Sequence, residues 1–425
     1  MSLFISKRRF LVVAFLLAMT IANLFLLSLL IPKLHHGYQD FTIFYTGARL
    51  LRSGQASSLY NLATQYQMQQ TFTQVPIRHG PLPFNHPPFE ALLFIPFTFL
   101  PYWTAYLMWT ALNFIMLAAI VILLRKHFSQ LAQIPTPVFG LAAIAFFPLA
   151  IGLMQGQDII LFLLLFVSAT ICLDQNKDQN QNKDQNKDAL AGLLLGAALF
   201  RPQTAVPLVI LLAARRWKVL IGFIPVALVL LGISVALLGW RGPFDYVHFV
   251  THIDGTNTSA FGPEAVPNLR GLVQELSLLN SSRPGPHSAS ALLLLVSSVL
   301  VFLLAWRRIR NGRDSIIFSA SLAAATTILV CFHALVYDFT LLFPIVLFIL
   351  ARILGPNAKA AEFNNGSANE TRLGSVEILI FILLFLTPVY IYLLLIADRF
   401  FCYSLILLTL YVKLLRTPSP AEVPA

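Results

Sequence analysis

Charged residues are scarce in this 425-residue chain. Asp, Glu, Lys and Arg make up 11% of the sequence, against 57% hydrophobic residues and a mean hydropathy of +0.76. Soluble domains carry roughly 25% charged residues, so this composition excludes an ordinary soluble fold and is typical of a polytopic membrane protein. The net charge of +11 does not indicate a nucleic-acid partner, because the basic residues gather in short segments between apolar stretches.

Cysteine is also rare. Cys172, Cys331 and Cys402 all fall in or at the ends of apolar segments, where a thiol behaves as a small hydrophobic group. They imply neither a disulfide framework nor a metal cluster. His35 and His36 are adjacent and therefore point in different directions on a helix or strand. The sequence thus identifies no metal ligands; no cofactor is expected, and a requirement for a divalent ion is left open.

Long apolar runs dominate what is present. Two of them, 189–200 and 204–214, are too short to span a bilayer and are expected to be half-helices that meet at Arg201 and Pro202. The stretch 87–100 is expected to be re-entrant or interfacial. The prediction is an all-α, multi-pass bundle with about 11–13 spans, placed near 10–31, 103–124, 137–153, 158–173, 189–200, 204–214, 219–238, 289–306, 315–332, 339–354, 375–397 and 400–415.

The distribution of basic residues predicts the orientation. Lys7, Arg8 and Arg9 precede the first span, and most of the 29 Lys and Arg fall on the same predicted side, so both termini are expected in the cytoplasm. The chain is expected to form one membrane-embedded domain, 1–425, with outer loops at 32–88 and 239–288. The cytoplasmic linkers are 174–188 and 355–374, and the first is a low-complexity repeat expected to be disordered. A bacterial plasma membrane fits best, although the endoplasmic reticulum would fit the same topology.

The predicted outer side carries the segments rich in polar, aromatic, Pro and Gly residues. Asp40 lies just beyond the first span, before an expected helix over 41–52 with Phe44, Ala48 and Leu51 on one face. Further segments are Phe84-Asn85-His86-Pro87-Pro88-Phe89, Gln155-Gly156-Gln157-Asp158, Phe200-Arg201-Pro202-Gln203, Asn268-Leu269-Arg270-Gly271 and the run from His333 to Tyr337-Asp338. Carboxylates, amides and arginines at the ends of spans on one side predict a single site there.

The order of these motifs over most of the chain resembles glycosyltransferase family 87, the polyprenyl-phosphate-mannose-dependent mannosyltransferases. The resemblance implies a GT-C fold, an outward-facing site, a lipid-phosphate sugar donor and a catalytic Asp at the position of Asp40. Two positions depart from the family pattern: Arg201 stands where Lys is common before Pro-Gln, and Asp158 follows the Gly-Gln pair.

Transfer from a sugar-1-phosphoryl lipid requires a base for the acceptor hydroxyl and positive groups for the departing phosphate. Asp40 is the predicted base, and a single base without a covalent partner favours inversion at the anomeric carbon. The predicted donor-phosphate and substrate-binding residues are Arg201, Arg270, His333, Tyr45, Gln157, Gln203, Tyr337 and Asp338. The expected partners are a polyprenyl-phosphate sugar, a glycolipid, glycan or protein acceptor, and the bilayer, with no nucleic acid.

Several of these residues also have a purely structural interpretation. Asp40 could cap the following helix, and Arg201 at a proline break could satisfy freed carbonyls or extend toward water. His333 and Asp338 could form a hydrogen-bonded pair at a helix end.

Other polar residues are also compatible with either a structural role or a role in binding. Gln155 and Gln157 could belong to a tight turn around Gly156. Asp245 and Glu264 could supply a second carboxylate, but both fall in a loop expected to be solvated.

The alternative function is a transporter or a flippase for lipid-linked glycans. Transporters are commonly built from repeated halves with matching broken helices, and no second copy of the 40–100 pattern is found. A non-catalytic scaffold would leave the one-sided set of polar residues unexplained.

Overall fold

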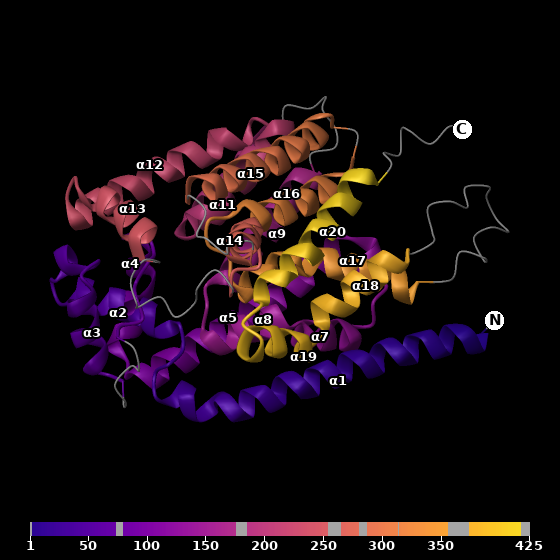
Figure 1. The fold of residues 1–425 in the computed structure, drawn as a ribbon, viewed down its shortest axis with the longest axis horizontal. Coiled ribbons are helices and arrows are strands. Elements are labelled where there is room, and N and C mark those ends of the chain that lie inside the picture. Colours follow the sequence, from indigo (N-terminus) through magenta and orange to yellow (C-terminus); the bar gives the residue numbers. More distant parts are fainter. Residues whose placement is uncertain are drawn as a thin grey trace.

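The computed structural model describes residues 2–73, 80–175, 185–253, 265–279, 287–312, 314–355 and 374–417 (Figure 1). Every regular element within these ranges is a helix, so the predicted all-α fold is confirmed. Glu264 and most of the linkers 174–188 and 355–374 lie outside the described residues.

Within the described ranges, five helical stretches are long and apolar enough to cross a membrane, and the number rises to seven if each of two bent helix pairs counts as one span. The five are contained in α1 (Ser2–His35), α5 (Tyr102–His127), α12 (Val219–Leu238), α15 (His287–Arg310) and the continuous pair η7 (Val336–Leu342) and α17 (Phe343–Leu354). α12 and α15 expose large apolar side chains such as Leu228, Val229, Leu295 and Val296. Such surfaces are suited to contact with lipid.

Two of the predicted spans are each a pair of helices joined at a sharp bend. The span at 137–153 consists of α7 (Thr136–Ala145) and α8 (Phe147–Gln155), which meet at 68°, and the span at 375–397 bends by 63° after α18 (Ser375–Phe385). Its second half begins with α19 (Thr387–Ile391). Pro148 and Pro388 lie in the first turn after each bend. Proline lacks the N–H for the helical hydrogen bond and clashes with the preceding turn, so each helix restarts at a new angle.

Shorter helices complete the bundle. They are α6 (Ser129–Ala132), α9 (Ile159–Gln175), α10 (Gln185–Ala197), η4 (Ala198–Phe200), α11 (Pro202–Arg215), α16 (Ile316–Val330), η9 (Tyr392–Ile396), η10 (Phe400–Cys402) and α20 (Tyr403–Arg416). The predicted meeting of two short helices at Arg201 and Pro202 is present, between η4 and α11. α10 and α12 cross with their backbones in contact, because a Cβ atom at Gly192 would collide with the carbonyl of Val219, and one at Gly222 with that of Ala189.

The loop segments form a group of small helices at one end of the bundle, where α2, α3, α4 and α13 lie together (Figure 1). They are α2 (Phe41–Arg52), η1 (Ala56–Ser58), α3 (Leu62–Gln70), α4 (Glu90–Phe94), η2 (Ile95–Phe99) and α13 (Gly242–His252). α14 (Leu269–Leu279) lies instead against α15 of the bundle. The expected face of α2 is observed: Phe44 and Ala48 are buried in an aromatic cluster, and Leu51 packs against a neighbouring cluster. α4 and η2 together are too short to cross a bilayer.

Candidate functional site

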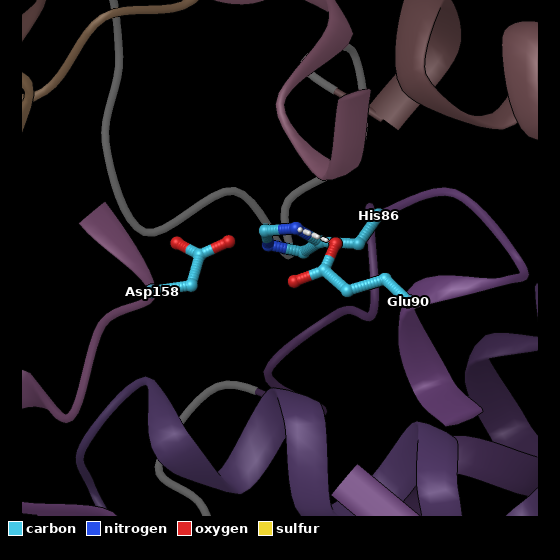
Figure 2. A group of neighbouring side chains, drawn as sticks. All are labelled: His86, Glu90 and Asp158. Carbon is cyan, nitrogen blue, oxygen red and sulfur yellow. Dashed lines mark ion pairs between the residues drawn. The ribbon is translucent and has the colours of Figure 1, made fainter. Parts of the chain in front are cut away.

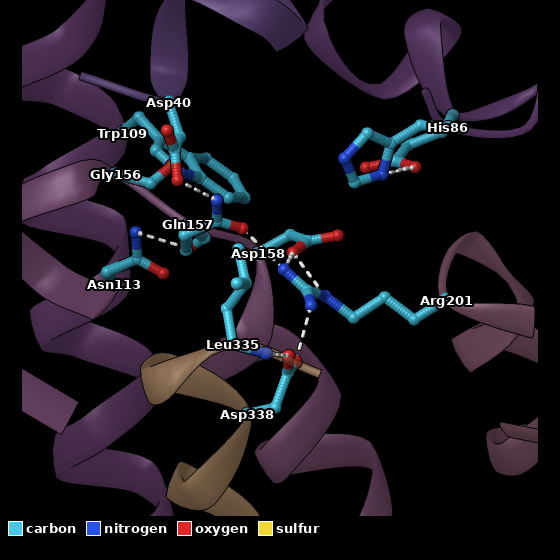
Figure 3. A network of polar contacts seen from close by, with 11 residues as sticks. Asp40, His86, Trp109, Asn113, Gly156, Gln157, Asp158, Arg201, Leu335 and Asp338 are labelled. Carbon is cyan, nitrogen blue, oxygen red and sulfur yellow. Dashed lines mark hydrogen bonds and ion pairs between the residues drawn. The ribbon is translucent and has the colours of Figure 1, made fainter. Parts of the chain in front are cut away.

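A cavity of about 320 Å³ lies where the small helices meet the ends of the bundle helices. It brings together six of the residues predicted from separate parts of the sequence: Asp40, Gln157, Arg201, His333, Tyr337 and Asp338. Figure 3 shows Asp40, Gln157, Arg201 and Asp338. Gln203 also lines it, and apolar side chains such as Ile43, Val250 and Leu335 complete the wall. The volume falls in the range of pockets for small ligands.

Asp40 immediately precedes α2, but its side chain does not cap that helix. Oδ2 instead accepts a hydrogen bond from Nε2 of Gln157 at 2.5 Å, and the backbone N–H of Asp40 donates to Oε1 of Gln155 at 3.0 Å. The partial positive charge at the start of α2 stabilises a carboxylate at this position. The side chain is partly exposed and lines the cavity, so its carboxylate is available to a ligand.

Gln157 connects Asp40 to Arg201. Its Oε1 accepts a hydrogen bond from Nη2 of Arg201, while its NH₂ group donates to Asp40. A guanidinium can only donate, so this contact fixes the orientation of the amide and leaves the NH₂ group facing the carboxylate. Gln157 is 1% exposed. It therefore keeps the side chains of Asp40 and Arg201 in fixed positions relative to each other.

The turn that carries Gln157 is held from behind by α5. Nε1 of Trp109 donates to the carbonyl of Gly156 at 2.8 Å, and Nδ2 of Asn113 donates to the carbonyl of Gln157 at 3.4 Å. Gly156 has φ +64°, and a Cβ atom there would lie 2.9 Å from Cβ of Phe41. The position thus requires glycine for both its conformation and its space.

A Gly156→Ala substitution should lower the free energy of unfolding by more than the roughly 1–2 kcal/mol that a left-handed conformation costs an L-residue. The added methyl group would also press on Phe41 and displace Gln157. Gly54→Ala is the matched control, since Gly54 has φ +74° but no atom within 4 Å of the added Cβ. Thermal unfolding in detergent should separate the two variants, and equal losses would show that the Phe41 contact is unimportant.

Arg201 is 3% exposed and lies between two aspartates (Figure 3). Its Nε donates to Oδ1 of Asp158 at 2.6 Å, with Nη2 at 2.5 Å from the same oxygen, and Nη1 donates to Oδ1 of Asp338 at 2.7 Å. Oδ2 of Asp338 accepts from the backbone N–H of Leu335 at 2.7 Å. Arg201 therefore does not extend toward water, and Asp338 is paired with it.

Burial has the largest effect on the pKa of Asp40 and raises it above its ordinary value. The hydrogen bond from Gln157 and the charge of Arg201 act in the opposite direction, because both stabilise the ionised form. A carboxylate whose pKa is raised binds a proton more readily than a free aspartate, and this suits a general base.

Two residues that were not among the predicted binding residues belong to this region: His86 lines the cavity, and Glu90 lies beside it. Nδ1 of His86 lies 2.8 Å from Oε2 of Glu90, and Glu90 is 1% exposed. Burial lowers the pKa of His86 to about 4, so the imidazole is neutral at pH 7 and the contact is not a salt bridge with a charged ring. Burial, followed by the nearby Asp158, raises the pKa of Glu90. The sequence feature that could have identified this pair is the four-residue spacing of His86 and Glu90 around Pro87-Pro88.

Two predicted binding residues lie away from the cavity lining. The hydroxyl of Tyr45 donates to the carbonyl of Leu100 at 2.9 Å within an aromatic cluster. Nη1 of Arg270 donates to the carbonyl of Phe332 at 3.0 Å, and the guanidinium stacks on the Phe332 ring. Asp245 is exposed on α13 and does not line the cavity either. Their roles toward a substrate stay predictions.

An all-helical bundle with membrane-spanning helices and a cavity that holds a carboxylate beside a fixed guanidinium defines a polytopic membrane protein with a polar ligand site. The model of glycosyltransferase family 87 matches residues 84–332, which is more than half of the chain. The chain therefore belongs to glycosyltransferase family 87, and its class is that of membrane glycosyltransferases. The matched range contains His86, Gln157 and Arg201, and Asp40 precedes it.

Two further comparisons, with curated proteins and with solved structures, find no match.

Proposed function

We propose that this protein transfers a hexose, mannose in the first instance, from a polyprenyl-phosphate donor to an acceptor hydroxyl, with Asp40 as the general base. The observation that carries the proposal is the placement of Asp40 and Arg201 in one cavity, where a single buried amide, that of Gln157, holds both. Family membership supports the class of reaction.

In the proposed step the acceptor oxygen attacks the anomeric carbon from the face opposite the phosphate. A bond forms between that oxygen and the carbon, while the bond from the carbon to the phosphate oxygen breaks and its electron pair leaves with the lipid phosphate. The acceptor proton moves to a carboxylate oxygen of Asp40. A single displacement of this kind inverts the configuration at the anomeric carbon.

The departing phosphate gains negative charge, which nearby donors would stabilise. Arg201 and His333 both line the cavity. Because the guanidinium of Arg201 is already hydrogen-bonded to Asp158, Asp338 and Gln157, it would act on the phosphate through its positive charge. The apolar part of the wall, with Ile43, Val250 and Phe332, offers a surface for the first isoprene units of the lipid.

We propose further that the cavity opens on the outer face of the membrane. This orientation rests on the cytoplasmic placement of Lys7, Arg8 and Arg9 and of most other basic residues. The same rule places both termini in the cytoplasm. A bacterial plasma membrane is the proposed location.

The test is a transfer assay with the full chain reconstituted in vesicles. Labelled polyprenyl-phosphate mannose and a membrane extract that supplies acceptors should yield a labelled glycoside with inverted anomeric configuration, measured by chromatography and NMR. Movement of the intact labelled lipid between leaflets, without any glycoside, would support the transporter alternative and overturn the proposal.

The pH dependence of the same reaction tests the base. Because only ionised Asp40 accepts a proton, kcat/KM should fall as the pH is lowered through the pKa of Asp40. The raised pKa places this fall above the pH at which a free aspartate, with a pKa of about 3.9, would protonate. In Gln157→Met the carboxylate loses the hydrogen bond that lowers its pKa, so the fall should move to a higher pH. An identical pH profile in both proteins would assign the titration to another group.

A further inference from the structure

Three side chains with metal-binding atoms meet beside the cavity: His86, Glu90 and Asp158 (Figure 2). One nitrogen of the imidazole and one oxygen of each carboxylate lie within 4.8 Å of one another. Three atoms so placed share a central point no more than about 2.8 Å from each, and small side-chain rotations would shorten these distances to the 2.0–2.2 Å typical of metal–nitrogen and metal–oxygen bonds. Figure 2 shows the imidazole of His86 between the carboxyl groups of Asp158 and Glu90.

The two acids in this group are buried and only partly satisfied. Asp158 is fully buried; its Oδ1 contacts Arg201, whereas Oδ2 has no hydrogen-bond partner in the part of the chain that the structure describes. Among the described residues, neither oxygen of Glu90 finds a hydrogen bond of good geometry, although Oε2 lies close to His86. Burying carboxylate oxygens without partners lowers the stability of the fold. A positive group bound where the three side chains meet would remove this cost.

The charges around the cavity also favour the binding of a positive group. Asp40 and Asp338 line the cavity, and Glu90 and Asp158 lie beside it, whereas Arg201 is the one lysine or arginine among the described residues that line it. Without a further positive group, this excess of acids would repel the phosphate of the proposed donor. Buried charges in proteins are normally paired or bound to a metal.

We propose that His86, Glu90 and Asp158 bind a divalent cation, of the Mn²⁺ or Zn²⁺ type, beside the cavity. One imidazole nitrogen and two carboxylate oxygens suit these ions, and three protein ligands leave a coordination position open. Oδ2 of Asp158 would bind the ion while Oδ1 keeps its contact with Arg201.

The role of the ion rests on the proposed function. An ion at this position would offset the excess negative charge and offer its open position to an oxygen of the lipid phosphate, as metal ions do at developing negative charge. Arg201 would keep its structural pairing with the two aspartates.

A proton shared between Glu90 and Asp158 is the competing explanation for their proximity. In that case the acids need no ion, and Glu90→Gln would leave metal binding unchanged, because there is none to lose.

Metal binding can be measured without any sugar transfer. The full chain, purified in detergent and treated with chelator, is titrated with Mn²⁺, and the free ion is followed by electron paramagnetic resonance. We expect one equivalent of Mn²⁺ bound per chain, displaced by Zn²⁺. Glu90→Gln and His86→Gln should each weaken binding at least about tenfold. His86 lies in a loop and its side chain is 11% exposed, so its variant remains informative if the fully buried Glu90 variant does not fold.

Asp174→Asn is the matched control. Asp174 forms a comparable pair with His127, whose Nε2 lies 3.0 Å from Oδ2, but this pair has no third ligand among the described residues. The control should bind Mn²⁺ as the unchanged protein does. Absence of binding by the unchanged protein, or equal affinity in all four proteins, overturns the site.

The two proposals fail separately. Mn²⁺ binding that depends on Glu90 and His86, without any glycoside product, would keep the metal site and overturn the proposed function. Sugar transfer that survives chelation, with no Mn²⁺ bound, would do the reverse.

Discussion

Replacing Asp40 with Asn should lower the rate of sugar transfer by about 10²–10⁴-fold, the usual contribution of a general base. The amide cannot accept the acceptor proton at neutral pH, but its oxygen can still accept the hydrogen bond from Nε2 of Gln157. The fold and membrane insertion should therefore be retained. Initial rates with labelled polyprenyl-phosphate mannose in reconstituted vesicles measure the effect.

Asp245→Asn is the matched control for this experiment. Asp245 is an acid on α13, whose other residues reach the cavity, but its own side chain is exposed and does not line it. This variant removes one negative charge near the site without removing a base, and the rate should stay within about twofold, as expected for an exposed charge. A near-normal rate in Asp40→Asn would remove Asp40 from the chemistry, and an equal loss in both variants would attribute the effect to net charge.

Replacing Arg201 with Met should lower the free energy of unfolding by about 3–5 kcal/mol, the usual cost of removing one partner from a buried ion pair. The thioether side chain fills a similar space but leaves Asp158 and Asp338 without their cation. Oε1 of Gln157 would also lose the hydrogen bond that the guanidinium donates to it. Thermal unfolding in detergent should show a clear decrease in Tm, accompanied by loss of transfer.

Arg52→Met controls for the loss of an arginine as such. The guanidinium of Arg52 donates to the carbonyl of Thr98 and stacks on the ring of Phe99, but no buried carboxylate depends on it. Its removal should cost about 1 kcal/mol, the typical contribution of a single hydrogen bond. If Arg201→Met were no more destabilising than this control, the two aspartates would have to be protonated or paired elsewhere.

The fold was largely predictable because hydropathy and proline act locally. An apolar run in a membrane protein has to form a helix to satisfy its backbone groups, and the helices appear where the runs were found. The break at Arg201 and Pro202 was predicted from segment length. The bends at Phe146 and Leu386 were not predicted, although Pro148 and Pro388 were visible, since a proline in the first turn of a helix is also compatible with a straight run.

The site was predictable where a polar residue interrupts the end of a span, as with Asp40, Arg201 and Asp338. The pairing between them was not, because Arg201 and Asp338 are 137 positions apart and no local pattern encodes such a contact. Glu90 was missed because it opens an otherwise apolar stretch and reads as an interfacial acid. Gln157 was interpreted mainly as part of a turn. It does lie at one, but its side chain is also the bridge between the acid and the cation.

The glycine crossing of α10 and α12 has a consequence for the evolution of this enzyme. α10 continues through η4 directly to Arg201, so the guanidinium is positioned by a helix that touches its neighbour main chain to main chain at Gly192 and Gly222. No side chain separates α10 from α12 at this crossing, so no substitution there can adjust the distance between the two helices. Adaptation to new sugars or acceptors is therefore expected in the loops on the far rim of the cavity, while this crossing stays fixed.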